Sequence, residues 1–452
     1  MKITISNKIF LQGIPTAFER ELIDHLTFPN PKWVENERMG RWNGDTPEYL
    51  SYYERPRDGL LLPRGYTRQL IGLCKRYGVQ YDIDDKRRVL PEVDFEFQGQ
   101  LRPFQDVAAK DILGRDFGTV SAPTGSGKTV MALYVIAERK QPALIIVHTK
   151  ELLYQWQARA VQFLDLQEEE IGLIGDGKKT IGPRLTIGIV NSVYKIADEV
   201  REHIGFLIVD ECHRCPSRTF VEAVTAFDSK YILGLSATPF RRDGLSRLIF
   251  WHLGDVVHEV KKGDLLQTGD IVPAEVVIRE TSFRTWLDPS EEYSTMLTEL
   301  TRDPERNQLI ALDVAAEAKN GGGICLVLSD RKAHCETLRA LLGLCDVQCE
   351  VLTGDVANGN RQQVIDRLNQ GKVKVLVATG QLIGEGFDCK RLSTLFLATP
   401  IRFDGRVIQY LGRVLRPAPG KDKAKVYDYV DAHIGVLKAS AKARERVFKS
   451  IS

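Results

Sequence analysis

The feature that most constrains this chain is a short apolar run, a glycine-rich turn and a helical pattern in succession, at residues 118–130. Such a turn points successive backbone N–H groups into one concavity, where the positive end of the helix adds to the field. Lys128 is placed to reach the β- and γ-phosphates of a nucleotide, and the Thr129 hydroxyl is placed to hold Mg²⁺. We therefore expect a nucleotide phosphate site here, whose other loop residues are Pro123, Thr124, Gly125, Ser126 and Gly127.

The chain around this loop has the pattern of a parallel α/β protein. From residue 101 onward, short β-branched runs alternate with helical patterns, which is typical of parallel strands joined by crossover helices. The expected buried strands of the first half are 119–121, 143–147, 185–190, 206–209 and 231–235, and a second sheet is expected to start at 324–328. Ligands of such sheets bind at the carboxyl ends of the strands. With 452 residues, the chain is long enough for two or three domains.

Two acids follow one of these strands. Asp210, directly after 206–209, is placed to hold the Mg²⁺ that bridges the β- and γ-phosphates. Glu211 is placed to orient and deprotonate the attacking water, and His213 to sense the γ-phosphate. Adjacent acids often merely end a strand, but downstream of a phosphate loop they indicate a phosphoryl-transfer site.

A further nucleotide contact is expected just before the loop, in the segment 101–105. The amide of Gln105 offers a donor and an acceptor side by side, which suits the edge of adenine. Because this segment lies shortly before the phosphate loop, Arg102 and Gln105 are both assigned to nucleotide binding.

Composition limits the class of protein. The formal net charge is only +2, so a basic surface for nucleic acid has to be local. No apolar run approaches the length of a membrane span, and the first residues lack the apolar core of a secretion signal. We therefore expect a cytoplasmic protein that does not enter membranes, with its eight scattered cysteines serving mostly as small core residues.

Residues 1–95 differ from the rest and predict a small α+β domain, with a helix at 70–77 and a strand edge or linker at 81–88. Aromatic rings alternate there with arginines, at Trp33, Arg38, Arg41, Trp42, Tyr49, Tyr52, Tyr53, Arg55 and Arg57. Rings that stack on bases and arginines that bind phosphates would suit nucleic acid, whereas the alternative is a domain core with arginines at its rim. Since 15 Lys plus Arg stand against 14 Asp plus Glu, charge does not decide between the two.

Five segments in a fixed order resemble the motifs of superfamily 2 helicases: motif I at 122–129, II at 210–213, III at 236–239, V at 375–388 and VI at 409–416. Ala122, where the general phosphate-loop pattern has glycine, is typical of helicases. The resemblance covers roughly residues 96–435 and is strongest to XPB-like helicases and to phage branched-DNA helicases of recombination. It implies two RecA-like parallel-sheet domains in tandem, with ATP and Mg²⁺ bound in the cleft between them.

The resemblance also assigns roles to single residues. Gln409, Arg413 and Arg416 would face the phosphates from the second domain, and the two arginines, three residues apart, would share one face of a helix. Gly386 and Asp388 would complete the nucleotide site. Coupling between ATP and nucleic acid is assigned to His213, Ser236 and Thr238. Contacts with the nucleic-acid backbone are assigned to Thr149, Lys150, Asn191, Ser192, Thr353, Gly354, Thr379 and Gly380.

These expectations combine into one hypothesis, an ATP- and Mg²⁺-dependent DNA helicase or translocase that acts on duplex or branched DNA. The expected parts are a substrate-recognition domain at 1–95, an ATP-binding domain at 96–262, a linker with the second RecA-like domain at 263–435, and a basic tail at 436–452. The tail is expected to be a solvated helix or a DNA contact. Three alternatives stay open: an RNA helicase, the motor subunit of a restriction or anti-phage complex, and an ATP-gated nucleic-acid clamp that does not unwind.

Overall fold

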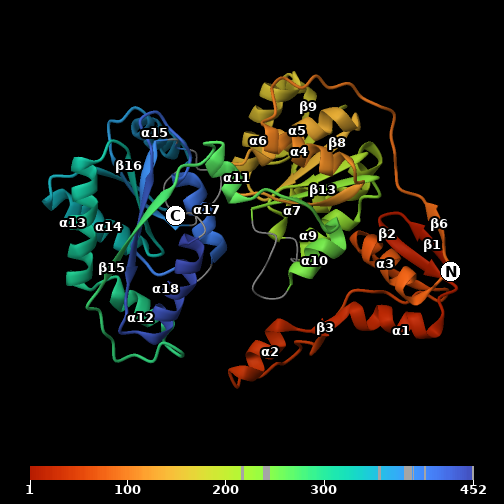
Figure 1. Cartoon of the computed structure of the whole chain (residues 1–452), viewed down its shortest axis with the longest axis horizontal. Coiled ribbons are helices and arrows are strands. Elements are labelled where there is room, and N and C mark those ends of the chain that lie inside the picture. Colours follow the sequence, from red (N-terminus) through yellow and green to blue (C-terminus); the bar gives the residue numbers. More distant parts are fainter. Residues whose placement is uncertain are drawn as a thin grey trace. The chain divides into compact units, whose positions relative to one another are not determined.

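The computed structural model describes residues 1–214, 218–237, 245–354, 358–380, 389, 391–401 and 404–449. The chain divides into two compact units, residues 1–122 with 127–260 and residues 123–126 with 261–452 (Figure 1). Each unit contains a parallel sheet with helices, so the predicted α/β class is confirmed. Within the described ranges, no helix is long and apolar enough to cross a membrane.

The first unit begins with a small four-stranded sheet in the order β5-β2-β1-β6. Its strands are β1 (Lys2–Ile5), β2 (Lys8–Gln12), β5 (Leu60–Pro63) and β6 (Asp82–Asp85), with β6 at the edge, parallel to β1. The helices α1 (Thr16–His25) and α3 (Thr67–Tyr77) supply apolar side chains to its core, and α3 confirms the helix predicted at 70–77. A hairpin of β3 (Thr27–Pro29) and β4 (Tyr49–Ser51) encloses α2 (Pro31–Arg38).

This small sheet shares a core with the structure that follows it. Leu248 and Trp251, from α10 (Ser246–Leu253), are buried in the same cluster as Leu70 of α3. The buried Arg64 donates from Nη1 to the Ser229 carbonyl oxygen at 2.7 Å. Deleting residues 1–95 would therefore expose apolar surface of the remaining unit.

The larger sheet of this unit has eight strands in the order β10-β9-β11-β8-β12-β13-β7-β14, and only β10 is antiparallel to its neighbour. Its strands are β7 (Phe117–Ser121), β8 (Ala143–Val147), β9 (Ile171–Gly175), β10 (Lys178–Lys179), β11 (Leu185–Ile189), β12 (Phe206–Val209), β13 (Tyr231–Ser236) and β14 (Val256–Glu259). Helix α4 (Pro103–Leu113) precedes these strands, and the helices between them are α5 (Lys128–Arg139), α6 (Lys150–Leu164), α7 (Val190–Lys195), α8 (Ala197–Val200), α9 (Arg218–Thr225) and α10. All five strands predicted for this half are present.

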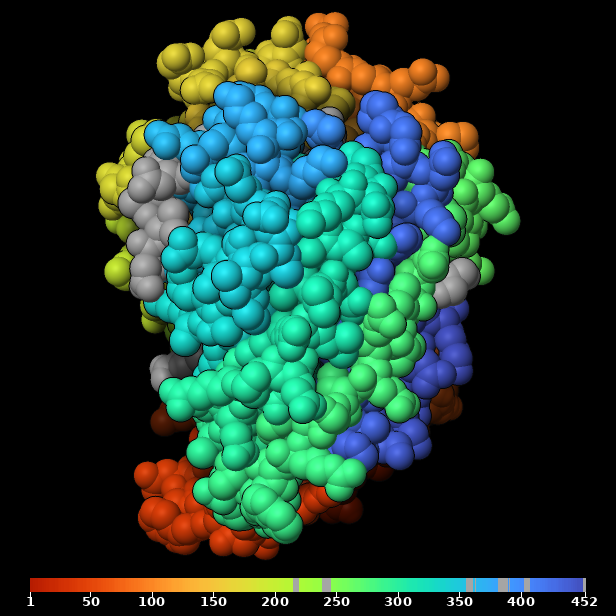
Figure 2. All heavy atoms as spheres, turned by 90° about the vertical axis from the view of Figure 1, so that its left-hand side faces the viewer, coloured from red at the N-terminus to blue at the C-terminus, as the bar shows by residue number. Residues whose placement is uncertain are grey.

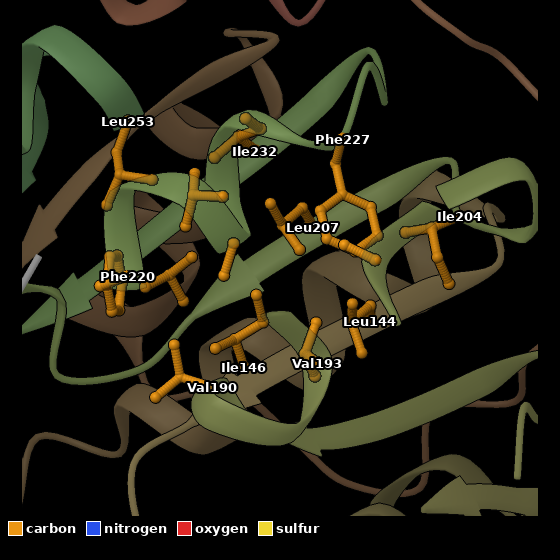
Figure 3. Packing of buried hydrophobic residues seen from close by; sticks show 14 of the residues in the cluster. Leu144, Ile146, Val190, Val193, Ile204, Leu207, Phe220, Phe227, Ile232 and Leu253 are labelled. Atoms are coloured by element: carbon orange, nitrogen blue, oxygen red, sulfur yellow. The ribbon is translucent and has the colours of Figure 1, made fainter. Parts of the chain in front are cut away.

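Continuous apolar runs place these strands in the interior. Leu144, Ile146 and Leu207 project from β8 and β12 and pack with Val193 and Phe220 of the covering helices (Figure 3). All of them are fully buried. Because both faces of the sheet are covered, the strands show apolar residues without alternation, which is why the sequence predicted them well.

The second unit holds a six-stranded, all-parallel sheet in the order β15-β20-β19-β16-β18-β17. Its strands are β15 (Ala274–Glu280), β16 (Ile324–Ser329), β17 (Cys349–Leu352), β18 (Val375–Thr379), β19 (Leu392–Leu397) and β20 (Ala424–Val430). Its helices are α11 (Lys262–Gln267), α12 (Tyr293–Leu300), α13 (Pro304–Asn320), α14 (Lys332–Leu344), α15 (Asn358–Asn369), α17 (Asp404–Val414) and α18 (Gly435–Phe448). Figure 2 shows one face of this unit, over which α12 and α13 lie (green to teal).

The prediction that this sheet starts at 324–328 is wrong, because β15 enters it earlier. β15 pairs along its whole length with β20, from Ala274 opposite Ala424 to Glu280 opposite Val430. It lies at the edge of the sheet, and only its first residue is buried. Its sequence therefore lacks the continuous apolar run that marks the central strands.

The basic segment after residue 435 is a packed helix rather than a solvated tail. On α18, Leu437, Val447 and Phe448 are buried, and Arg444 is only 2% exposed. Arg444 donates from Nε to Asp428 Oδ1 at 2.9 Å, and its Nη2 lies 2.8 Å from the same oxygen. A composition rich in lysine and arginine predicted solvation because it does not reveal the buried carboxylate on β20 that holds this arginine.

Candidate active site

Three neighbouring strands of the first unit bring Lys128, Asp210 and Glu211, three of the predicted catalytic residues, to their carboxyl ends. β12 ends at Val209, β13 at Ser236 and β7 at Ser121, and they lie side by side in the order β12-β13-β7. Asp210 therefore follows the first strand, and the phosphate loop follows the third. The N–H of Ala122 donates to the Ser236 carbonyl oxygen at 2.9 Å, which fixes the start of the loop against β13.

The loop after β7 depends on its two internal glycines. Gly125 and Gly127 have φ values of 94° and 78°, in the left-handed region that glycine adopts without steric cost. The Ser126 hydroxyl donates to the Pro123 carbonyl oxygen at 2.7 Å and closes the turn. Helix α5 begins at Lys128, directly after Gly127, so the loop leads into a helix N-terminus as predicted.

Gln105 supports this loop from the start of α4. Its Oε1 accepts a hydrogen bond from the Arg102 N–H at 3.0 Å, and the side chain is only 4% exposed. A Cβ at Gly127 would lie 2.3 Å from Nε2 of Gln105, so this amide nitrogen lies against the loop. In this position Gln105 braces the phosphate loop, and its contact with adenine stays a prediction.

Asp210 and Glu211 form an acidic pair whose members differ in environment, since Asp210 is buried and Glu211 is half-buried. Burial and the neighbouring Glu211 carboxylate raise the pKa of Asp210, against the opposing effects of Trp156 and Lys128. Burial also acts on Glu211, but its close contact with His213 and the charge of Lys128 lower its pKa well below the ordinary value. Glu211 is therefore the member of the pair that holds its negative charge more firmly.

His213 connects this pair with the neighbouring strand. Its Nδ1 lies 3.2 Å from Glu211 Oε2 and 3.2 Å from Ser236 Oγ. Glu211 has a φ of 49°, which non-glycine residues rarely adopt and which is frequent at functional sites. The structure thus brings two of the three predicted coupling residues, His213 and Ser236, into contact with each other, and His213 also contacts the predicted base. Three other predicted residues lie outside the described ranges: Thr238, Gly386 and Asp388.

Trp156, on α6, was not predicted and completes the site. Its Nε1–H donates to Asp210 Oδ2 at 2.8 Å, while Asp210 Oδ1 accepts the Glu211 N–H at 2.9 Å. One donor on each oxygen fixes the rotation of the carboxylate. Trp156 is 2% exposed, and a buried indole N–H needs an acceptor. Trp156 lies on the helix that follows β8, and β8 pairs with β12, the strand that Asp210 follows. This neighbouring position is the feature from which a contact between Trp156 and Asp210 could have been predicted.

We predict that Trp156→Phe raises the Mg²⁺ concentration for half-maximal ATP hydrolysis about tenfold, because a hydrogen bond to a charged group is worth about 1.5–3 kcal/mol. A Mg²⁺ titration of ATP turnover measures this. Tyr154→Phe is the matched control, since it removes a hydrogen bond from the same helix to the surface residue Asp176. Equal Mg²⁺ titration curves for the two variants would contradict the role of Trp156.

The residues of this site fit a nucleotide with Mg²⁺. Mg²⁺ in proteins is held by one or two oxygen ligands together with substrate phosphates, and Asp210 with the hydroxyl of Thr129 is such a set. Lys128 donates from Nζ to the Ala122 carbonyl oxygen at 2.9 Å, so its ammonium group lies across the loop. In the described part of the chain, no group of three or more His, Cys, Asp or Glu forms a further metal site.

In the second unit, α17 carries Gln409 and Arg413, both half-buried. The helix ends at Val414, so the prediction that Arg413 and Arg416 share a helical face is wrong. Pro417 accounts for the ending, because the residue before a proline avoids the helical conformation. Arg416 instead lies in the segment that leads towards β20.

The predicted nucleic-acid contacts lie at the carboxyl ends of β8, β11, β17 and β18. They are Thr149, Lys150, Asn191, Ser192, Thr353, Gly354, Thr379 and Gly380. Thr149 caps α6 by accepting the Leu152 N–H at 3.3 Å, and Lys150 Nζ lies 2.7 Å from Asp176 Oδ2. A Cβ at Gly380 would lie 2.3 Å from the Tyr410 hydroxyl oxygen, so this glycine leaves room for the tyrosine side chain. The nucleic-acid contacts stay predictions.

The aromatic and arginine residues of the first 95 positions separate into two groups. Tyr52 stacks on Phe28 with ring centroids 5.8 Å apart and packs against the core. Trp42, by contrast, is 92% exposed, and Tyr49 is 53% exposed. The exposed arginines are Arg38, Arg41, Arg55 and Arg57. The interpretation as a domain core therefore describes Tyr52. The exposed rings and arginines lie on the surface, as the nucleic-acid interpretation expects.

Comparison with known proteins identifies the family. Residues 98–241 match the family described as "Type III restriction enzyme, res subunit", and residues 302–418 match the "Helicase conserved C-terminal domain". The chain belongs to the superfamily 2 helicases, which use ATP to drive work on nucleic acid.

Particular relatives share most of the chain. It is 27% identical over 400 residues to a putative ATP-dependent RNA helicase of Acanthamoeba polyphaga mimivirus, over 84% of this chain and 74% of that protein. It is 27% identical over 348 residues to the DNA 3'-5' helicase XPB of Mycobacterium tuberculosis, over 73% of this chain and 60% of that protein. A fragment of a putative HsdR subunit of a type I restriction enzyme from Vibrio vulnificus has a TM-score of 0.59 at 18% identity, covering 77% of this chain and 66% of that one. The last likeness shows the shared fold, with two RecA-like domains.

Proposed function

We propose that this chain is an ATP- and Mg²⁺-dependent DNA helicase or translocase that acts on duplex or branched DNA. The ATPase part is supported by one observation, the acidic pair in which two N–H donors orient the buried Asp210 beside a charged Glu211. The DNA part is supported by the mycobacterial relative, which is named a DNA helicase. It is also supported by Cys212, because motif II here lacks the spelling of DEAD-type RNA helicases.

The residues of the first unit would divide the reaction between them. Bound ATP with Mg²⁺ supplies the phosphoryl group and the charge of the metal. Thr129 and Asp210 would hold the ion, and Lys128 would bind the β- and γ-phosphates. Glu211 would orient a water molecule and accept its proton on the carboxylate as the water oxygen bonds to the γ-phosphorus and the bond from that phosphorus to the ADP oxygen breaks. His213, in contact with this carboxylate, would carry its change of charge to β13.

The second unit supplies the remaining part of the proposal. Arg413 and Arg416 are proposed to bring positive charge to the γ-phosphate during transfer, with Gln409 beside them. A planar guanidinium binds phosphate oxygens with two parallel N–H donors, which a lysine cannot do. Gly386 and Asp388 are kept as proposed partners of the nucleotide.

Unwinding assays on defined substrates test the proposed function. Forked DNA, a Holliday junction and an RNA duplex are compared for ATP-dependent strand separation, with ATP turnover measured beside it. We expect ATP-dependent separation of the DNA substrates without a partner protein. Activity confined to the RNA duplex would replace the DNA assignment with that of an RNA helicase. ATP turnover without strand separation or movement would instead indicate a clamp.

The exposed residues of the β3–β4 hairpin are proposed to recognise the DNA substrate. We predict that Trp42→Ala weakens binding of forked DNA about tenfold, since stacking of a base on an aromatic ring is worth about 1–3 kcal/mol. Fluorescence anisotropy with labelled forked DNA measures the affinity. Trp286→Ala, at another fully exposed tryptophan, is the control and should bind as the wild type does. An equal affinity of the two variants would contradict this role of the hairpin.

A further inference from the structure

A single lysine ties the end of the motif VI segment to a central strand. Lys421 lies between α17 and β20, and its Nζ donates to the carbonyl oxygens of Leu392 at 2.6 Å and Arg416 at 2.7 Å. It also donates to the carbonyl oxygen of Val414, the last residue of α17. These three acceptors match the three donors of an ammonium group. Leu392 is the first residue of β19, so one amine joins two separate parts of the unit.

Two of the hydrogen bonds of Lys421 go to backbone carbonyl groups at the end of α17 and just after it. The last carbonyl groups of a helix have no partner within it, and a cation there also interacts favourably with the helix dipole. In the segment after α17, Leu415 accepts the N–H of Val272 at 2.8 Å. The carbonyl groups of Val414, Leu415 and Arg416 are thus all held, two of them by Lys421. The backbone on either side of Arg416 is therefore fixed in place.

We propose that Lys421 is a positioning residue, which holds residues 413–416 so that the guanidinium groups of Arg413 and Arg416 keep the orientation that ATP hydrolysis needs. This inference rests on the proposed function, in which these arginines act on the γ-phosphate. Lys421 itself does not touch the reacting atoms. Its effect is to be seen in the rate of the reaction more than in the affinity for ATP.

The electrostatic surroundings of Lys421 make its three hydrogen bonds to carbonyl oxygens sensitive to pH. Burial lowers the pKa of Lys421 to about 8, the positive charge of Arg416 lowers it as well, and Cys389 acts in the opposite direction. Other charged groups line the cavity of about 770 Å³ beside it: Glu317, Arg391, Asp422, Lys423 and Lys425. Two of these lysines pair with carboxylates, Lys423 with Glu275 and Lys425 with Glu317.

The sign of the pH effect follows from the number of donors. Protonated Lys421 has three N–H donors for three carbonyl groups, whereas the neutral amine has two and turns a lone pair towards the third. The full set of three hydrogen bonds is present well below pH 8 and is lost as the pH rises through the pKa of Lys421. An arginine at this position stays protonated over the whole range.

The test compares Lys421→Met and Lys421→Arg with the wild type in DNA-stimulated ATP hydrolysis. Lys421→Met should lower kcat at least about tenfold and change KM for ATP less than about threefold. Lys421→Arg should restore most of kcat at pH 7.5, and the ratio of its kcat to that of the wild type should rise about tenfold between pH 7.5 and 9.5. Lys423→Met is the matched control, because Lys423 lines the same cavity but pairs with Glu275. It should behave as the wild type does.

The outcomes separate this inference from the proposed function. Arg413→Ala and Arg416→Ala are measured beside the lysine variants, and wild-type kcat in both would overturn the proposed role of the arginines. Loss of kcat in those two with kcat of Lys421→Met within twofold of the wild type would overturn the role of Lys421 alone. Binding of a fluorescent ATP analogue shows that each variant is folded. If Lys421→Met does not fold, the pH dependence of the Lys421→Arg ratio decides, and a flat ratio overturns the inference.

Discussion

Glu211→Gln is expected to bind ATP and to hydrolyse it about a hundredfold to ten-thousandfold more slowly than the wild type, which is the range that a general base contributes. The Glu211 carboxylate is held anionic by His213 and Lys128, so it can accept a proton at neutral pH. The glutamine amide has the same shape and tolerates the same backbone conformation, but it cannot take that proton. Single-turnover ATP hydrolysis, together with binding of a fluorescent ATP analogue, measures the two effects separately.

The control for this variant is a glutamate outside the site. Glu199→Gln removes a carboxylate that pairs with Lys179 at the surface, 2.9 Å away, and should leave both ATP binding and hydrolysis unchanged. Turnover by Glu211→Gln at the wild-type rate would contradict the assignment of the base. Loss of ATP binding in this variant would instead show that Glu211 serves the structure of the site.

Local chemistry explains why much of the site could be predicted from the sequence. Gly125 and Gly127 are required by their backbone conformations, and Lys128 follows them at the start of α5. Asp210 follows a strand whose four residues are all buried, so its place at the carboxyl edge of the sheet was predictable. Each of these inferences needs only a few neighbouring residues. The five central strands of the first sheet were predictable for the same reason.

Contacts between distant parts of the chain account for the errors. The bond between Trp156 and Asp210 joins residues 54 positions apart, and no local pattern marks it. Arg444 is buried because Asp428 faces it from β20, whereas its own neighbours predicted a solvated helix. Edge position explains β15, where only the first residue is buried and no continuous apolar run marks the strand. Only Arg416 was missed for a local reason, since Pro417 was already visible in the sequence.

Lys128→Ala is the second variant with a large expected effect. Lys128 Nζ donates to the Ala122 carbonyl oxygen at 2.9 Å, and its charge lowers the pKa of both Asp210 and Glu211. Without it, the phosphate loop loses its cation, and the carboxylates of Asp210 and Glu211 lose a positive charge that acts on both. We expect kcat/KM for ATP to fall about a hundredfold to a thousandfold, as for other groups that stabilise charge in a transition state.

The same variant should also weaken ATP binding, which distinguishes it from Glu211→Gln. Lys128→Ala acts on the phosphates already in the bound state, whereas the base acts only during the reaction. Lys110→Ala is the control, because Lys110 is an exposed lysine on α4 that pairs with Asp106 at 2.6 Å. Titration with a fluorescent ATP analogue should show a raised Kd for Lys128→Ala and a wild-type Kd for Lys110→Ala. Wild-type binding and turnover by Lys128→Ala would mean that the loop at 122–129 is not the phosphate site, and the assignments of Asp210 and Glu211 would fall with it.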